Sequence, residues 1–382
     1  MRSIVRLAAW AALLATWGPQ AKADITVGAI LSITGPAAAL GGPERNAVEL
    51  MPTTLAGEKV RYVVLDDGTD STGALRAARK LIDDEHVDII FGPSAAPTSL
   101  TVLEAASAAG TPMITVAGCA ACVEPPGGKR RWAFKLAPND APIMDLITAD
   151  MARNGVRSMA NFAFATSFGD AFAAAMDASA QRRGIATLLT VRYNPADASV
   201  TPQALRLLAA KPDAVFIAGS GGPAVTPIIE LRQRGYGGTI YSNPGAAGTD
   251  VLRLGGAAVE GLILAVSPFF VAEQLDEASP VKPVALRFVQ TYEARFGAGT
   301  RSQPAASMWD AYLITDAAAR KALAQAKPGT PEFRQALRDA LEQTDMVASQ
   351  GVFTMSPDNH SGSDERALIL AKVQRGVWTL VK

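Results

Sequence analysis

The candidates for catalysis or metal binding in this 382-residue sequence are its two cysteines, its two histidines and the adjacent pair Asp66 and Asp67. Cys119 and Cys122 have the spacing of a redox motif, but a thioredoxin-type pair lies at a helix start, and here a Pro/Gly-rich segment follows. Two thiols without two further ligands are weak evidence for zinc. In an oxidising compartment we expect this pair to form a structural disulfide.

The remaining candidates do not form a catalytic set. His86 and His360 are the only histidines, and neither has a ligand or nucleophile at a suitable spacing, so both are expected to be solvated surface groups. Asp66 and Asp67 end a predicted strand and are expected to make turn and cap hydrogen bonds. No Walker loop or dinucleotide fingerprint follows a strand. The sequence predicts no catalytic residue, no metal site and no cofactor.

A turn between two apolar runs is the strongest candidate for binding. The runs are 87–91 and 113–117, and a helical pattern lies between them. This β-α-β order predicts a parallel sheet covered on both faces, and such sheets bind ligands at the carboxyl ends of their strands. The turn 92–99 falls there.

The start of the helix in this unit carries the donors. With Pro97 in its first turn, the amides of Ala96, Thr98 and Ser99 and two hydroxyls are expected to point into the crevice and to receive a carboxylate or another small acceptor group. The alternative interpretation is an ordinary connection that binds nothing.

The first residues predict export. Arg2 and Arg6 precede an apolar run over 7–18, and an A-x-A cleavage site ends at Ala23. The run is too short to span a membrane. Position 24 is Asp, so lipid attachment to a cysteine is excluded. We expect a periplasmic protein without residues 1–23.

The net charge and the length of the chain restrict its possible partners and its domain organisation. The chain has 36 basic and 36 acidic residues, and loss of the three basic residues in the leader gives the mature protein a net charge near −3. Nucleic acid is therefore an improbable partner. The mature length exceeds what one hydrophobic core usually supports, which predicts two lobes.

The order of elements agrees with two lobes. Alternating strands and helices run from Ile25 to Leu136 and restart after Pro138, which predicts two doubly wound α/β units. Three later helices, predicted over 284–296, 305–326 and 331–342, have no strands of their own. We expect them to return and cover one of the lobes.

Several segments together carry a resemblance to a known family. They are Gly28–Gly41, Leu65–Ile82, Val87–Pro93, Gly110–Ala117, Ser167–Phe172, Val259–Leu262 and Phe288–Phe296. In this order and spacing the chain resembles the type I periplasmic solute-binding proteins of branched-chain amino-acid-type ABC transporters, the leucine/isoleucine/valine-binding protein family.

The resemblance implies a fold and a partner. It implies an α/β fold with two doubly wound lobes joined by a three-segment hinge. Lobe 1 would comprise 24–139 and 268–350, and lobe 2 would comprise 140–267 and 351–382. Small-molecule solute would be clamped between the lobes of a monomer and delivered to an ABC transporter membrane permease.

The resemblance also implies the ligand-binding positions. They are Leu40, Ala96, Pro97, Thr98, Ala117, Gly118, Cys119, Phe168, Ser220, Gly221 and Gly245. The acid that pairs with an amino-acid ammonium would fall near Pro244 or Gly245, where this sequence has no carboxylate, although Asp140 could supply a remote partner. Because an unpaired buried ammonium costs several kcal/mol, the site is expected to take a small organic acid, such as an aromatic carboxylate.

Three other functions stay open at this stage. One is a branched-chain or other amino-acid binder of the same transporter class. Another is a ligand sensor that presents its occupied form to a membrane receptor, since the fold also serves sensing. The third is an exported enzyme, for which the sequence offers no nucleophile-base pair.

The leader generates the first testable prediction. N-terminal sequencing of protein exported from its own cells should begin at Asp24, because Ala21 and Ala23 are small enough for signal peptidase. An Ala23→Arg variant should accumulate with its leader attached. Mature protein that begins at Met1 would contradict the cleavage site.

Overall fold

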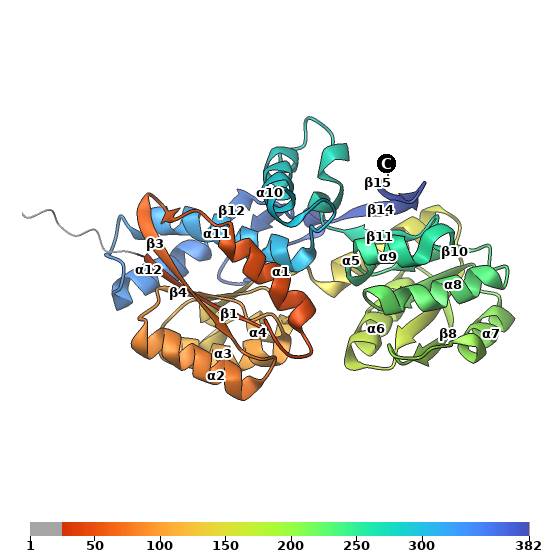
Figure 1. Ribbon diagram of the computed structural model, residues 1–382, viewed down its shortest axis with the longest axis horizontal. Helices are drawn as coiled ribbons and strands as arrows, with labels where there is room; N and C mark the ends of the chain where they lie inside the picture. The colour runs from red at the N-terminus through yellow and green to blue at the C-terminus, as the bar shows by residue number, and fades with distance from the viewer. Residues whose placement is uncertain (1–24, 382) are drawn as a thin grey trace, which may run out of the picture.

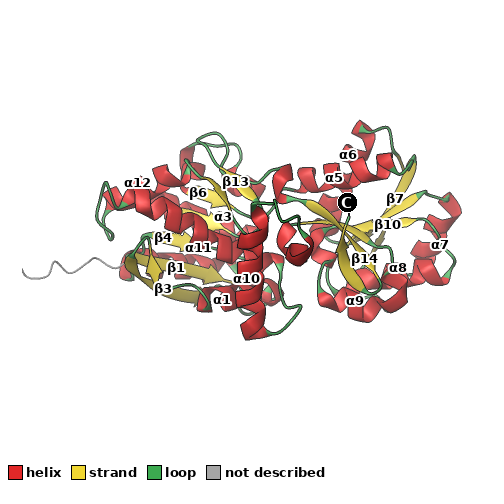
Figure 2. Ribbon diagram, turned by 90° about the horizontal axis from the view of Figure 1, so that it is seen from above, coloured by secondary structure: helices red, strands yellow, loops and turns green. Residues whose placement is uncertain are grey.

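The computed structural model describes residues 25–381, and these residues form two α/β lobes that lie side by side (Figure 1). Each lobe has a largely parallel sheet with helices on both faces (Figure 2). The predicted fold class, two doubly wound α/β lobes, is confirmed. The predicted leader, residues 1–23, lies outside the described residues.

The first sheet has the strand order β2-β3-β1-β4-β5-β6. Its strands are β1 (Ile25–Leu31), β2 (Thr54–Leu55), β3 (Glu58–Asp66), β4 (Ile89–Phe91), β5 (Met113–Thr115) and β6 (Ala133–Lys135). All neighbours pair in parallel except the short β2. The side chains of β1 and β4 are buried throughout, as expected for strands covered on both faces.

Helices from two parts of the chain cover this sheet. One face packs against α2 (Ser71–Arg79), α3 (Ala96–Ala108) and α4 (Ala120–Val123). The other packs against α1 (Ala38–Glu49), α10 (Val281–Phe296), α11 (Gln303–Ala322) and α12 (Pro331–Leu341). The last three are the helices without partner strands, so their predicted return to a lobe is confirmed.

The second sheet has the strand order β15-β14-β11-β10-β9-β7-β8. Its parallel strands are β7 (Ser158–Phe164), β8 (Ala186–Tyr193), β9 (Ala214–Ala218), β10 (Thr239–Ser242) and β11 (Ile263–Val266). The final strands, β14 (Ile369–Gln374) and β15 (Val377–Leu380), extend it antiparallel. One face packs on α5 (Asp140–Arg153) and α6 (Ser167–Arg182), and the other on α7 (Thr201–Ala210), α8 (Val225–Gln233) and α9 (Thr249–Gly255).

The predicted lobe limits remain a prediction, but one segment packs differently from its assignment. Residues 351–382 were assigned as a whole to lobe 2. Strand β13 (Val352–Thr354) pairs with β12 (Asp345–Val347), and Phe353 and Met355 lie in the core of the first lobe. Only from β14 onward does the chain join the second sheet.

The expectation that both histidines are solvated is wrong for one of them. His360 is 2% exposed, its ring stacks on Phe134 at a centroid distance of 4.4 Å, and its two ring nitrogens contact Ala133 O and Glu342 Oε1. His86 is exposed as expected. His360 therefore attaches the segment after β13 to the edge strand β6, a long-range contact that sequence spacing does not show.

Asp310 holds the segment that precedes β13. It is fully buried in α11 and accepts hydrogen bonds from the amides of Ser349 at 2.8 Å and Gln350 at 3.0 Å and from the Gln350 side chain at 2.9 Å. Burial raises the pKa of Asp310 to about 6, and these hydrogen bonds oppose the shift.

No helix in the described part of the chain is long and apolar enough to cross a membrane.

Removal of the Asp310 carboxyl should destabilise the fold. Asp310→Ala would leave two buried amides without acceptors, and we expect a loss of about 3 kcal/mol in urea denaturation. Arg320→Ala, an exposed change on the same helix, should cost less than about 0.5 kcal/mol. Equal midpoints for the two variants would contradict this role of Asp310.

Candidate functional site

The loop after β4 begins the candidate site. Gly92 has φ +89°, and a Cβ at this position would lie 2.1 Å from Ile30 O, so only glycine fits this turn beside β1. The turn leads into α3, whose N-cap Ala95 offers no side-chain cap. Pro97 is exposed, Ala96 is half-buried and Thr98 is buried.

The donors at this helix start differ in part from those predicted. Thr98 Oγ1 and Ser99 Oγ donate to Ala95 O at 2.9 and 2.8 Å, and the Ser99 amide donates to the same oxygen at 2.9 Å. The expectation that both hydroxyls and the Ser99 amide face a crevice is therefore wrong. The amides of Ala96 and Thr98 belong to the first turn, where no intrahelical acceptor exists, and the described residues provide no other acceptor.

The loop after β5 lies beside this helix start. Ala117 and Cys119 are buried, Gly118 is exposed, and Cys119 Sγ lies 3.9 Å from Ala96 O. The Cys119 amide is already used, because it donates to Ala117 O at 2.8 Å. The two predicted loops of lobe 1 are thus in contact.

Cys119 and Cys122 form a disulfide, as predicted. One argument for it was wrong, because the segment that follows Cys119 is a single helical turn, α4, with Cys119 as its N-cap residue. Both sulfur-bearing side chains are buried, at 2% and 0% exposure. The pair thus does lie at a helix start. It differs from an accessible redox pair because both side chains are buried.

The loop after β1 completes the site edge of lobe 1. Asp66 accepts hydrogen bonds from the amides of Ile33 (3.0 Å), Thr34 (3.2 Å) and Gly68 (2.9 Å), which fixes this loop. Partial burial pushes the pKa of Asp66 up, but these bonds and one from the Thr34 hydroxyl outweigh it, so the pKa is lowered. The expected turn role of Asp66 is confirmed. Leu40, in the following helix, is 38% exposed.

The second lobe places an aromatic cluster at its own carboxyl edge. Phe168 lies in the first turn of α6 and is 38% exposed. Its ring centroid is 4.8 Å from that of Phe172 and 6.4 Å from that of Phe164. Of these three, only Phe168 was predicted from the sequence as a ligand-binding residue. The i, i+4 spacing of Phe168 and Phe172 on α6 was a signal that could have identified Phe172, whereas Phe164 ends β7 and is brought near by the turn into α6.

The loops after β9 and β10 are tied together. The Gly221 amide donates to Gly245 O at 2.9 Å, and Asn243 binds Gly219 O at 2.8 Å and the Gly245 amide at 2.8 Å. A Cβ on Gly245 would lie 2.8 Å from both Ser220 Cβ and Asn243 Oδ1. An acidic side chain therefore does not fit at Gly245 without displacing one of these neighbours.

A lysine and an aspartate lie where the chain leaves lobe 1. Lys135 ends β6, opposite Thr115 of β5, and is 1% exposed, with its Nζ donating to Ala137 O at 2.5 Å. Burial lowers the pKa of Lys135 to about 8, against the charges of Asp140 and Glu124. Burial likewise raises the pKa of Asp140, which Lys135 opposes. Lys135 was not among the residues predicted for the site.

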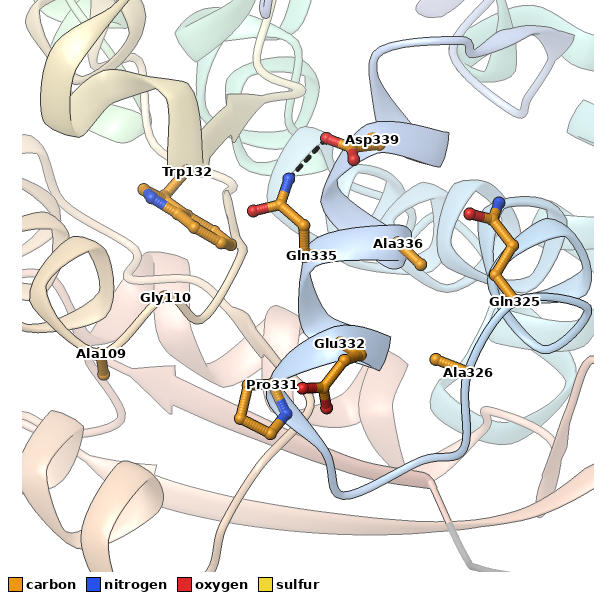
Figure 3. A pocket seen from close by; sticks show the side chains of 10 residues that line it. All are labelled: Ala109, Gly110, Trp132, Gln325, Ala326, Pro331, Glu332, Gln335, Ala336 and Asp339. Carbon is orange, nitrogen blue, oxygen red and sulfur yellow. Dashed lines mark hydrogen bonds between the residues drawn. The ribbon is translucent and has the colours of Figure 1, made fainter.

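The predicted residues thus form two groups, one on each lobe. Leu40, Ala96, Pro97, Thr98, Ala117, Gly118 and Cys119 lie at the carboxyl ends of β1, β4 and β5, and Phe168, Ser220, Gly221 and Gly245 lie at those of β7, β9 and β10. A hollow of about 550 Å³ at the opposite end of lobe 1, beside Trp132 and Asp339, contains none of them (Figure 3). In residues 25–381 no cluster of three metal-ligating side chains occurs.

Comparison with known proteins identifies the family. The periplasmic binding protein family matches residues 24–376, so the chain belongs to that family. A solved extracellular ligand-binding receptor from Rhodopseudomonas palustris HaA2 is 40% identical, with a TM-score of 0.84 over 94% of this chain and 100% of that one.

Two curated relatives are more distant. The Leu/Ile/Val-binding protein BraC3 of Rhizobium johnstonii is 23% identical over 65% of this chain and 68% of its own length. The chemotactic signal transduction substrate-binding protein BasB of Halobacterium salinarum is 26% identical over 56% of this chain and 55% of its own. Relatives of this kind bind solutes, and the chain is accordingly a binding protein and not an enzyme.

The disulfide can be tested directly. Exported protein treated with a thiol reagent under denaturing conditions without reductant should take up no label, because both cysteines are bonded. The same protein reduced beforehand should take up two labels and serves as the control. Two labels without reductant would show that the bridge does not form.

Proposed function

We propose that this protein is the periplasmic substrate-binding component of an ABC importer, and that it captures a small organic acid, with an aromatic carboxylate as the leading candidate. Residues 1–23 would direct export and be removed after Ala23. The mature monomer would close its two lobes on the solute and deliver it to a membrane permease. Membership of the periplasmic binding protein family supports export and solute capture.

The proposed ligand class rests on two features together. Lobe 1 has free backbone amides, and lobe 2 has no acidic side chain at the position that would pair with an ammonium. The amides of Ala96 and Thr98 lack acceptors at a helix start, an arrangement that suits a carboxylate. At the matching position in lobe 2 the sequence has Pro244 and Gly245 and no carboxylate, and a Cβ on Gly245 would already press on Ser220. An α-ammonium would therefore lose its hydration without a paired charge.

The aromatic part of the proposal rests on lobe 2. Phe164, Phe168 and Phe172 form one cluster, and Phe168 keeps 38% of its surface exposed. A planar ligand ring stacked on Phe168 would gain about 0.5–1.5 kcal/mol beyond the area it buries. Leu40 would add apolar contact from lobe 1.

Two alternatives are favoured by particular relatives. Similarity to a Leu/Ile/Val-binding protein favours an amino-acid ligand, for which Asp140 would have to act as the remote partner of the ammonium. Similarity to a chemotactic substrate-binding protein favours a sensor that presents its closed form to a receptor. A neighbouring permease gene would favour import over sensing.

Calorimetry should separate the ligand classes. We expect benzoate or an aliphatic carboxylate to bind with Kd near 1 μM, about −8 kcal/mol, and leucine and valine to bind much more weakly. Phe168→Ala should weaken benzoate about tenfold. Leu188→Ala, with a similarly exposed apolar side chain on β8, should leave the affinity unchanged.

The opposite pattern would overturn the ligand assignment. Tight leucine binding without a response to any simple carboxylate would restore the amino-acid alternative. Import or sensing would then still have to be decided by the partner.

A further inference from the structure

A buried polar cluster that takes no part in the predicted ligand contacts lies behind the site loops of lobe 1. Glu44 of α1 is 1% exposed, and Ser94, in the loop between β4 and α3, is 3% exposed. The Ser94 hydroxyl donates to Glu44 Oε2 and accepts the amide of Ser32, in the loop after β1, at 2.9 Å. One hydroxyl thus joins α1 to two site loops.

The carboxyl group in this cluster has no compensating charge. Within residues 25–381 no ion pair to Glu44 occurs, and the nearby charged group is the buried carboxylate of Asp67, after β3. Burial raises the pKa of Glu44 to about 8; the Ser94 bond opposes this shift and Asp67 adds to it. At neutral pH the Glu44 carboxyl is therefore mainly uncharged.

The other elements around α1 bring no further charge to Glu44. Tyr292 of α10 directs its hydroxyl to Pro43 O at 3.3 Å. On α11, which packs along α1, the buried Asp310 is occupied by Ser349 and Gln350. Arg45 and Glu49 of α1 itself are half-exposed and pair with each other at 3.5 Å.

We propose that Glu44 is a positioning residue of the candidate ligand site: its buried carboxyl group accepts the Ser94 hydroxyl and so fixes the two loops that meet at the carboxyl ends of β1 and β4. Ser94 lies two residues before Ala96, whose amide is free at the start of α3. Loss of the Glu44 contact would leave the Ser94 hydroxyl buried without an acceptor, and the loop would rearrange to satisfy it. The consequence for ligand affinity rests on the proposed function, whereas the loop conformation does not.

Hydrogen exchange of the ligand-free mature protein, followed by mass spectrometry with residue-level fragmentation, tests the positioning role. The readout is the protection of the Ser32 amide, which donates to Ser94 Oγ. At pH 6.5, Glu44→Gln should retain wild-type protection because it is neutral and has the same shape, and Glu44→Ala should lose about tenfold. Glu49→Ala, on the exposed face of α1, is the matched control and should not change it.

The pH dependence distinguishes positioning from packing. An opening that exposes Glu44 to water returns its pKa to the ordinary value, whereas in the closed state the carboxyl keeps its proton up to about pH 8. The Ser32 protection factor of the wild type should therefore fall about tenfold as the pH rises from 6.5 to 8 and stay level above that. Glu44→Gln should show no such fall. Loss of protection in Glu44→Gln at pH 6.5, equal curves for wild type and Glu44→Gln, or full protection in Glu44→Ala would each overturn the proposal.

Binding measurements separate this inference from the proposed function. With benzoate as the probe at pH 6.5, Glu44→Gln should bind as tightly as the wild type, and Glu44→Ala should bind more weakly because the loops are no longer held. If benzoate does not bind at all, the ligand assignment fails while the exchange result still decides the role of Glu44. Should Glu44→Ala fail to fold, the Glu44→Gln curves alone decide it.

Discussion

Burial of both faces of a parallel sheet is the constraint on which this structure depends. Strands β1, β4 and β5 can run through the middle of lobe 1 only because α2 and α3 cover one face and α1 and α11 the other. Parallel strands end at a common edge, so the loops that follow them come together there whatever their separation in sequence. The same arrangement in lobe 2 gathers the loops after β7, β9 and β10.

At the ends of β1, β4 and β5, backbone groups rather than charged side chains carry the polar character. Asp66 is committed to the loop after β1, and Thr98 and Ser99 to Ala95 O. The groups left free are amides, which donate but carry no charge, so they favour an anion only through local dipoles. A site of this kind would select ligands by their shape and by the absence of a carboxylate that could pair with an ammonium.

The sequence predicted the elements better than their partners. The three helices predicted over 284–296, 305–326 and 331–342 lie within a few residues of α10, α11 and α12, because helical periodicity is a local signal. The long-range contacts could not be predicted in this way. His360 looked like a turn residue, but its contact with Ala133 spans 227 positions. Glu44 reaches Ser94 over 50 positions.

The candidate site, too, could be predicted from local signals but not in its contacts. Turn chemistry at Gly92 and the aromatic at Phe168 were visible as residue types, whereas the use of the Ser99 amide inside α3 and the occupied hydroxyls required coordinates. Spacing alone also could not show that Ser220 approaches Gly245. Local patterns therefore identified where a site would lie and left open which groups are free within it.

The return of α10, α11 and α12 to lobe 1 has a consequence for how the chain is made. Until residues 281–341 have been synthesised, one face of the first sheet lacks most of its cover, while α5 to α9 and the parallel strands of lobe 2 are already complete. Lobe 2 in turn waits for β14 and β15, so both lobes depend on segments made late, and neither is completed in simple N-to-C order. A nascent chain would therefore carry one apolar face of the first sheet uncovered until α10, α11 and α12 have been made.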